Sequence, residues 1–326
     1  MVSFQTVKQS NTGVASLPKG LVALFIGATS GIGQSTLEHF AQYASSPRIY
    51  SVARSQTVAS HEELLASLRQ ANPTGTYNLI TADVSLISEI DKVVNAVTQK
   101  ETKLDILVMS AGFIAFEGRE DTREGLDPSM TTRYYTRLRA LQKLLPLLNN
   151  AASPRVVSVL AAGMEGPLNE DDLDLRDPAH WSHWNASVHS ATMGTLALEK
   201  LARENPRLSI VHWLPGPTST PGLTRVEKLS KAWPNPMPQE EAGARALFLA
   251  TSDRYAVNGG LLPVPEGLEV AKKSGGGIFL VDPKGENTGN EDLLGDFRKR
   301  GVDEAVWSFT QKVFAAAQGG ASKDEL

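Results

Sequence analysis

The sequence predicts an α/β protein built on one doubly wound parallel β-sheet, and three observations support this prediction. A short apolar segment, residues 21–26, runs directly into a glycine-rich turn at 27–33. Apolar residues at helical spacing follow this turn from 34 to 43, and further short β-rich segments then alternate with helical ones. Strands separated by helices need crossover connections, so we expect parallel strands with helices covering both faces of the sheet.

The remaining elements follow in chain order. Runs rich in β-branched and apolar residues predict strands at 48–53, 77–82, 104–109, 155–160 and 208–214, with 278–281 as a candidate seventh. Helical spacing predicts helices at 62–70, 87–98, 130–148 and 187–202. These elements belong to one domain at 20–285, which we expect between an N-terminal extension, 1–19, and a C-terminal extension, 286–326.

The two extensions differ in what they predict. A stripe of apolar residues at helical spacing indicates that the C-terminal extension forms a helix docked on the core; the stripe is Val302, Val306, Phe309 and Val313. Residues 3–16 and 318–326 carry no such pattern, and we expect both segments to be loosely ordered.

Composition excludes several classes of function. The chain has 326 residues, of which 41% are hydrophobic, so it can bury a large core. Its formal charge of −4 and pI near 5.9 argue against a nucleic-acid partner, because phosphates require a basic face. The absence of cysteine excludes disulfides, thiolate metal sites and cysteine nucleophiles, and we expect no metal site.

The chain also shows no membrane or secretion signal. Its longest apolar run near the start, 21–26, is far shorter than a membrane span, and residues 1–19 lack the continuous apolar stretch of a signal peptide. The last four residues, 323–326, match an endoplasmic-reticulum retention address. Because that address is read only inside the lumen, we interpret it as a solvated tail and expect a cytoplasmic protein.

The glycine-rich turn predicts a dinucleotide-binding site. A strand, a turn carrying Gly27, Gly31 and Gly33, and then a helix are the context that such a site requires. A side chain in the turn would keep a pyrophosphate away from the backbone N–H groups at the helix N-terminus. The alternative is a tight turn that only packs the helix on the strand.

Further motifs resemble a known family. Gly27, Gly31 and Gly33 match the pattern T-G-x-x-x-G-x-G, with Ile26 in place of threonine. Residues 83–84 match a D-V pair, 110–112 match most of N-N-A-G, and 215–220 match P-G-x-x-x-T. From residue 21 to about 280 the chain therefore resembles the short-chain dehydrogenase/reductase family, whose members have a Rossmann-type fold.

The resemblance implies which residues contact the cofactor. In the family the D-V pair lies by the adenine, and the P-G-x-x-x-T stretch holds the nicotinamide end. The binding residues implied are Gly27, Ser30, Gly31, Ile32, Gly33, Arg54, Asp83, Val84, Ala111, Gly112, Pro215, Gly216 and Thr220.

Arg54 indicates which nucleotide binds. An NAD-selective site commonly places a carboxylate after the second strand to bond the ribose hydroxyls. Arg54 stands there instead, and a guanidinium pairs with a 2′-phosphate that a carboxylate would repel. We therefore expect NADP(H); the alternative is a solvent-exposed arginine without a ligand.

The catalytic residues of the family are replaced. Its reductases use a tyrosine as proton donor, a lysine four residues on, a serine after the fifth strand and an asparagine in the fourth helix. Ser187 stands at the tyrosine position, Ala191 at the lysine position and Arg133 at the asparagine position. Leu160 and Ala161 stand where serines are expected. A serine hydroxyl without a neighbouring cation is a poor acid, so carbonyl reduction by the standard route should be crippled.

Three residues are candidates for replacement chemistry. Arg133 could stabilise a developing oxyanion or hold a substrate carboxylate, unless it is a surface cation beside Arg137. Glu165 could exchange a proton if burial raises its pKa, unless it is an ordinary loop carboxylate. Ser187 is the third candidate.

Other residues near these candidates have plainer interpretations. His189 lies about 200° round the helix from Ser187, so we expect a core or surface histidine. His180 and His183 have metal-compatible spacing but no evident third ligand. The acidic run at 170–174 is expected to be solvated. Trp181 and Trp184 either wall an apolar substrate or pin their loop to the core.

Three functions remain open. Segments 133–137 and 156–160 resemble fungal members of natural-product pathways, among them bifunctional reductase/Diels–Alderases that reduce an iminium-type substrate with NADPH. The first function is therefore an NADPH-dependent reductase acting on a bulky apolar small molecule. The second is a non-redox cyclase or isomerase that retains NADP(H), and the third is a catalytically inactive nucleotide-binding protein. A homo-oligomer is compatible with each.

Overall fold

A seven-stranded sheet forms the centre of the molecule, and every pairing in it is parallel. The computed structural model describes residues 1–112, 118–227 and 234–319. The strands lie in the order β3-β2-β1-β4-β5-β6-β9. Their bounds are β1 Val22–Ile26, β2 Arg48–Ala53, β3 Thr76–Thr81, β4 Ile106–Met109, β5 Arg155–Val159, β6 Ser209–Trp213 and β9 Phe279–Val281. The predicted doubly wound sheet is confirmed, including its seventh strand.

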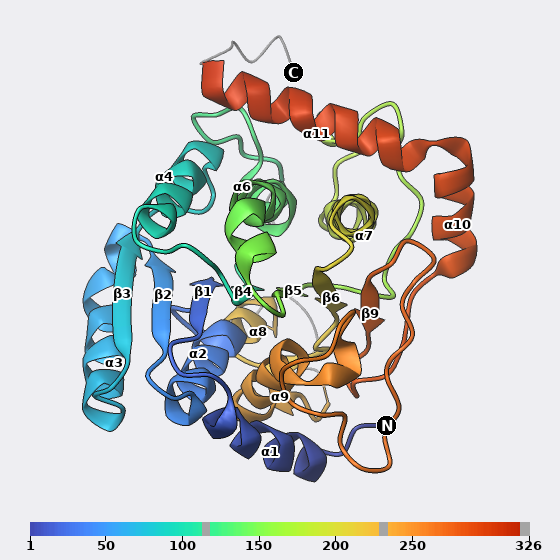
Figure 1. The fold of residues 1–326 in the computed structure, drawn as a ribbon. Helices are drawn as coiled ribbons and strands as arrows, with labels where there is room; N and C mark the ends of the chain where they lie inside the picture. Colours follow the sequence, from blue (N-terminus) through green and yellow to red (C-terminus); the bar gives the residue numbers. More distant parts are fainter. Residues whose placement is uncertain (113–117, 228–233, 320–326) are drawn as a thin grey trace.

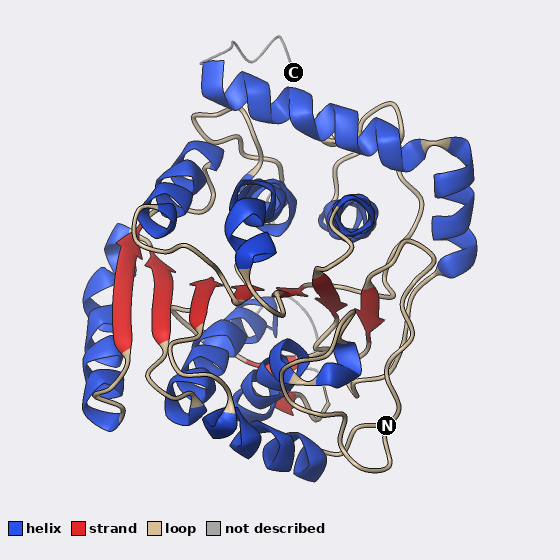
Figure 2. Cartoon of the chain, viewed as in Figure 1, coloured by secondary structure: helices blue, strands red, loops and turns tan. Residues whose placement is uncertain are grey.

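Helices cover both faces of this sheet (Figure 1, Figure 2). One face carries α1 Phe4–Thr12, α2 Gly31–Tyr43, α3 Val58–Ala71 and α9 Gln239–Thr251. The other carries α4 Ile87–Thr98, α6 Thr136–Asn150 and α7 His183–Glu204, with α10 Glu291–Arg300 and α11 Val302–Gly319 farther out. Shorter elements are η1 Gly13–Ser16, η2 Ser55–Thr57, α5 Pro128–Met130, η3 Thr131–Tyr135, β7 Thr218–Ser219, α8 Pro221–Glu227, β8 Met237–Pro238 and η4 Asp253–Tyr255.

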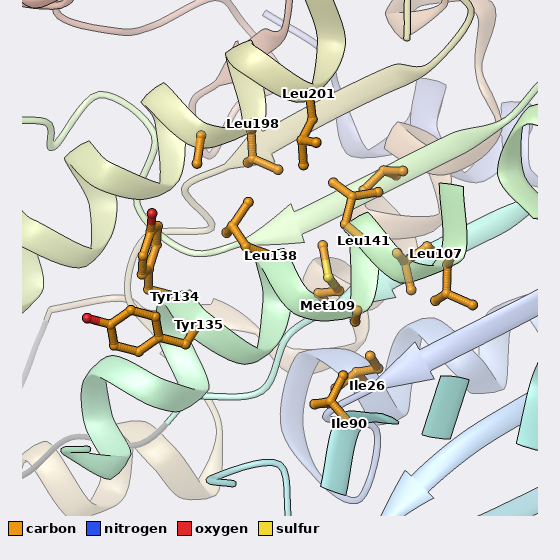
Figure 3. Packing of buried hydrophobic residues seen from close by; sticks show 14 of the residues in the cluster. Ile26, Ile90, Leu107, Met109, Tyr134, Tyr135, Leu138, Leu141, Leu198 and Leu201 are labelled. Atoms are coloured by element: carbon orange, nitrogen blue, oxygen red, sulfur yellow. The ribbon is translucent and has the colours of Figure 1, made fainter. Parts of the chain in front are cut away.

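The core is split by the sheet into two apolar layers. Alternate residues of β1 point to opposite sides: Leu24 joins the cluster beneath α4, α6 and α7, whereas Phe25 joins the cluster beneath α2 and α9. Figure 3 shows leucines of α6 and α7, such as Leu138 and Leu198, together with Met109 of β4. Among the described helices, none combines the length and hydropathy that a bilayer span needs.

The N-terminal extension is more ordered than expected. The prediction that residues 3–16 are loosely ordered is wrong, because they form α1 and η1. Val7 and Val14 are fully buried, and Asn11 Nδ2 donates a hydrogen bond of 2.8 Å to the carbonyl oxygen of Ala244 in α9. The buried residues Val7, Val14 and Asn11 thus hold this segment on the face of the sheet that carries α9.

The C-terminal helix α11 lies over α6 and α7. Val302, Val306 and Val313 are buried, and Figure 1 shows α11 crossing over α6 and α7 on the side away from the sheet. Arg203 and Asp303 form an ion pair of 2.6 Å between α7 and α11. The tail expected to be loose lies, from residue 320 on, outside the described residues.

The predicted helix at 130–148 has a different start. Residues Thr131–Tyr135 form a π-helical turn between α5 and α6. Thr136 Oγ1 bonds the carbonyl oxygen of Thr131, five residues earlier, and Arg137 Nε bonds that of Thr132. Such wider turns change which side chains share a helix face, and they recur at functional sites.

Candidate active site

Two glycines let the turn after β1 cross the end of β4. Gly27 has a φ of +98°, and a Cβ there would lie 2.2 Å from the backbone nitrogen of Ala111. A Cβ on Gly33 would lie 2.2 Å from Ser110 Oγ. Ser110 Oγ itself donates a hydrogen bond of 3.0 Å to the carbonyl oxygen of Gly27. Close packing therefore accounts for these two glycines even without a ligand.

Gly31 differs from them. It begins α2 with a φ of +62°, and a Cβ there would meet only the side chain of Thr220, at 3.3 Å. Ser30 takes the N-cap position but makes no side-chain cap bond. Ile32 is partly buried and packs against the apolar cluster beneath α2 and α9. The helix N-terminus and Thr220, far apart in sequence, therefore face each other, as the motif match requires for a bound dinucleotide.

The other expected cofactor residues lie along the same carboxyl edge of the sheet. Arg54 follows β2, is exposed, and has no ion pair within the described ranges. Asp83 follows β3 and accepts hydrogen bonds from the N–H and hydroxyl of Ser85, while Val84 is half-buried. Among the described residues, a Cβ on Gly112 would meet nothing within 4 Å.

The β6 end completes this edge. Pro215 and Gly216 follow the last residue of β6, and Gly216 turns the chain with a φ of +71°. Pro283, after β9, would lie 3.1 Å from a Cβ at Gly216. The carboxyl ends of parallel strands at the point where strand order reverses form the usual ligand crevice of such sheets.

Arg133 of η3 and Ser187 of α7 contact each other. Arg133 Nη1 donates a hydrogen bond of 3.0 Å to Ser187 Oγ. Ser187 Oγ donates in turn to the carbonyl oxygen of His183, at 2.9 Å. Arg133 is only 9% exposed, so the alternative of a surface cation is wrong. Burial lowers the pKa of Arg133 to about 10, and the charge of Asp127 opposes that shift.

Arg137 is a site residue that the sequence did not identify. It is 3% exposed and spans the ends of β4 and β5. Its guanidinium donates hydrogen bonds to Ser158 Oγ at 2.8 Å, to the carbonyl oxygen of Val159 at 2.9 Å and to that of Ala111 at 2.5 Å. Burial, and secondarily the charge of Arg133, lower the pKa of Arg137 to about 9.

Comparison with known families agrees with this edge geometry. The sequence profile of the family described as short chain dehydrogenase matches residues 21–228. The chain is a member of the short-chain dehydrogenase/reductase family.

Several similar proteins come from fungi. The chain is 66% identical, over the whole length of both proteins, to the NmrA-like family domain-containing oxidoreductase notO of Aspergillus sp. (strain MF297-2). It is 38% identical to oxidoreductase AN1596 of Emericella nidulans, with 97% of this chain and 99% of that protein covered. Both relatives are named as oxidoreductases.

Solved structures show the same fold. NADPH-bound carbonyl reductase from chicken fatty liver superposes with a TM-score of 0.57 at 17% identity, covering 84% of this chain and all of that one. L-Sorbose reductase of Gluconobacter frateurii, complexed with NADPH and L-sorbose, gives 0.54 at 20% identity, covering 72% and 90%.

The structure shows the surroundings of the residues at the family's catalytic positions. Ser187, at the tyrosine position, is half-buried and uses its one proton toward a backbone carbonyl. Ala191, at the lysine position, is fully buried. A guanidinium from the neighbouring helical turn, Arg133, is the charged group that contacts Ser187.

Glu165 takes part in a buried hydrogen-bond network. Its Oε1 accepts a hydrogen bond of 2.7 Å from Thr195 Oγ1, and its Oε2 accepts one of 2.8 Å from the N–H of Gly163. Burial raises the pKa of Glu165, and the Thr195 hydrogen bond opposes that shift. The alternative of an ordinary loop carboxylate does not fit, since this residue is only 5% exposed.

His212 of β6 is a second residue that the sequence reading missed. Its Nε2 accepts a hydrogen bond of 3.1 Å from the N–H of Ala161, and its Nδ1 lies 2.9 Å from Thr195 Oγ1. Burial lowers the pKa of His212 to about 3. A neutral imidazole and a carboxylate thereby hold the loop after β5, where the family places its serine.

His183 lies on the same face of α7 as Ser187, four residues earlier. Burial and the charge of Arg133 lower the pKa of His183. His180 instead bonds Asp172, at 2.9 Å. No cluster with the ligands for a metal occurs in the part of the chain that the structure describes.

The insertion before α7 is anchored by Asp174. This residue is 2% exposed and accepts hydrogen bonds from the Tyr135 hydroxyl at 2.7 Å and from Arg119 at 2.8 Å. The prediction that the acidic run is solvated is therefore wrong at Asp174. Trp181 packs against the core and pins the insertion, whereas Trp184 is 61% exposed. His189 is buried, so of the two expected environments, core and surface, it has the first.

Proposed function

We propose that this chain is an atypical NADPH-dependent reductase of a fungal secondary-metabolite pathway, acting on a bulky apolar intermediate without the tyrosine and lysine of its family. The observation that carries the proposal is the Arg133–Ser187 hydrogen bond of 3.0 Å. This bond joins the residues at the family's asparagine and tyrosine positions. A hydrogen-bonded cation therefore lies next to the position of the family's proton donor. The similarity to fungal oxidoreductases supports the same conclusion.

The residues at the carboxyl edge fit a dinucleotide phosphate. The α2 N-terminus at Gly31 carries no side-chain cap, and a Cβ on Gly112 would meet none of the described residues within 4 Å. Arg54 is exposed at the end of β2 and suits a 2′-phosphate. When bound, the cofactor supplies the hydride.

The chain's own residues then stabilise charge. Arg133 presents a preorganised cation from a dry environment, where a developing oxyanion is stabilised most strongly. Ser187 orients Arg133 but is a poor acid, because its proton is directed to the carbonyl oxygen of His183. Glu165 and His212 support the loop after β5 instead of exchanging protons with substrate.

A deuterium-transfer experiment tests this function against the two alternatives. Deletion of the gene in its host should accumulate the substrate, which is then incubated with the purified chain and NADPH deuterated at C4. We expect a product carrying one deuterium from the correctly labelled face. A product without deuterium would indicate a cyclase or isomerase, and nucleotide binding without any product would indicate an inactive protein; either result contradicts the proposal.

A further inference from the structure

Two buried guanidinium groups lie next to each other in the candidate active site. Arg133 is 9% and Arg137 3% exposed. Within the described residues, their hydrogen-bond acceptors are neutral: the Ser187 hydroxyl for Arg133, and the Ser158 hydroxyl and backbone carbonyls for Arg137. Neutral acceptors satisfy N–H groups, and no carboxylate of the described residues contacts either guanidinium.

Other buried arginines of this chain are paired with carboxylates. Arg155, with a side chain 1% exposed, lies 2.7 Å from Asp253. Arg139, two residues after Arg137, lies 2.8 Å from Asp91. Arg139 and Arg155 thus each have a carboxylate partner. For Arg133 and Arg137, no carboxylate in the described part of the chain is in contact.

Asp127 is the acid that acts on Arg133 from a distance. Its Oδ1 accepts hydrogen bonds from the N–H groups of Ser129 and Met130, at 2.9 and 3.0 Å, which caps the helix start. Burial raises the pKa of Asp127. Its attraction offsets only part of the desolvation of Arg133, whose pKa stays below its ordinary value.

We infer that the substrate supplies an anion to this pair: it presents a carboxylate to the guanidinium of Arg133. This inference rests on the proposed function and names its substrate class. A guanidinium has five N–H donors in a planar fork that suits two oxygens. The bond to Ser187 uses one end of the fork and fixes its direction.

The same charges disfavour a cationic substrate. An iminium group placed beside Arg133 would face two guanidinium groups, with no carboxylate of the described residues in contact. Like charges at short range in a poorly solvated site repel strongly. The iminium chemistry of the fungal reductase/Diels–Alderases therefore suits this site less well than an oxyanion does.

A pair of isosteric probes tests the inference directly. 1-Naphthoate and 1-naphthamide share size and apolar surface but differ in charge. We expect calorimetric titration of the full chain, with NADPH present, to give a dissociation constant for naphthoate at least about tenfold lower than for naphthamide, about 1.4 kcal/mol. Arg133→Met should remove that preference, and Arg133→Lys should retain part of it.

A matched control separates local from overall charge. Arg139→Met removes the same charge from the adjacent helix, where Asp91 is the partner, and should keep the naphthoate preference. Equal affinities in the wild-type chain, or a preference unchanged by Arg133→Met, would overturn the inference. The wild-type comparison needs no variant to fold. The titration measures binding and needs no turnover. Its result can therefore be interpreted even if the deuterium-transfer experiment fails.

Discussion

The hydroxyl of Tyr134 lies 2.6 Å from Thr310 Oγ1, and this buried contact ties the π-helical turn to the C-terminal helix. Thr310 Oγ1 donates its own proton to the carbonyl oxygen of Val306, at 2.7 Å, so Tyr134 is the donor. Tyr134 is adjacent to Arg133 in the turn. The C-terminal extension thus helps to fix the arginine of the candidate site.

A double-mutant cycle measures this contact. Thr310→Val leaves a buried Tyr134 hydroxyl without its acceptor and should lower the free energy of unfolding by about 1–3 kcal/mol. Tyr134→Phe should cost about 1 kcal/mol. In the double variant the two losses should not add, and urea denaturation of all four chains gives the coupling. Strict additivity would show that the contact contributes nothing.

Acid should destabilise the chain through His212. Its pKa lies near 3 in the folded protein and near 6.5 when unfolded, so between these values the unfolded chain binds the extra proton. Stability is therefore complete above about pH 6.5 and falls as pH drops, by about 1.4 kcal/mol per unit from this group. Urea denaturation between pH 5 and 7 should show this slope.

The variant His212→Asn isolates the contribution. It removes the titrating group, so its stability deficit relative to the wild type should shrink as pH falls from 7 to 5. Parallel pH slopes for wild type and His212→Asn would contradict the assignment.

The sheet was predictable because its signals are local. Each strand is a short apolar run, and Gly27 and Gly33 mark a crossing that only glycine permits. The register that places Arg133 and Ser187 at catalytic positions came from counting along two helices, and the structure brings the two side chains together. Motif spacing therefore sufficed for the edge of the sheet.

The remaining features depend on partners that a sequence does not display. Arg137 is held by backbone oxygens of β4 and β5, and backbone groups leave no mark in the residue pattern. α1 packs on α9, more than two hundred residues away, through Asn11, and Val7 of α1 and Val14 of η1 are buried. Asp174 appeared as one member of an acidic run, although tertiary contacts with Tyr135 bury it.

Cofactor choice should depend on Arg54. We expect NADPH to bind at least about tenfold more tightly than NADH, a gap of about 1.4 kcal/mol, because the exposed guanidinium can pair with the 2′-phosphate. Arg54→Asp should weaken NADPH binding and spare NADH, as measured by calorimetry. Equal affinities of the wild-type chain for the two nucleotides would remove Arg54 from the site.

Ordinary carbonyl reduction should be negligible. Ser187 directs its proton to the His183 carbonyl, and Ala191 supplies no cation, so simple ketones and aldehydes lack a proton donor. NADPH oxidation should stay at background across a panel of such substrates. Turnover near a typical enzyme rate, about 10 per second, would show that another acid serves the site.

The role of Arg133 can be separated from that of Ser187 by comparing their variants. Arg133→Met should keep NADPH affinity within a few-fold but lose about 10²–10³ in turnover of the natural substrate, as expected when a preorganised charge is removed. Ser187→Ala should lose much less turnover. It removes one hydrogen-bond acceptor of Arg133, but the guanidinium charge remains. Arg139→Met, which breaks a pair outside the site, should leave turnover nearly unchanged. If Ser187→Ala abolished turnover while Arg133→Met preserved it, the hydroxyl would have to be the reacting group, and the cation-based site would be wrong.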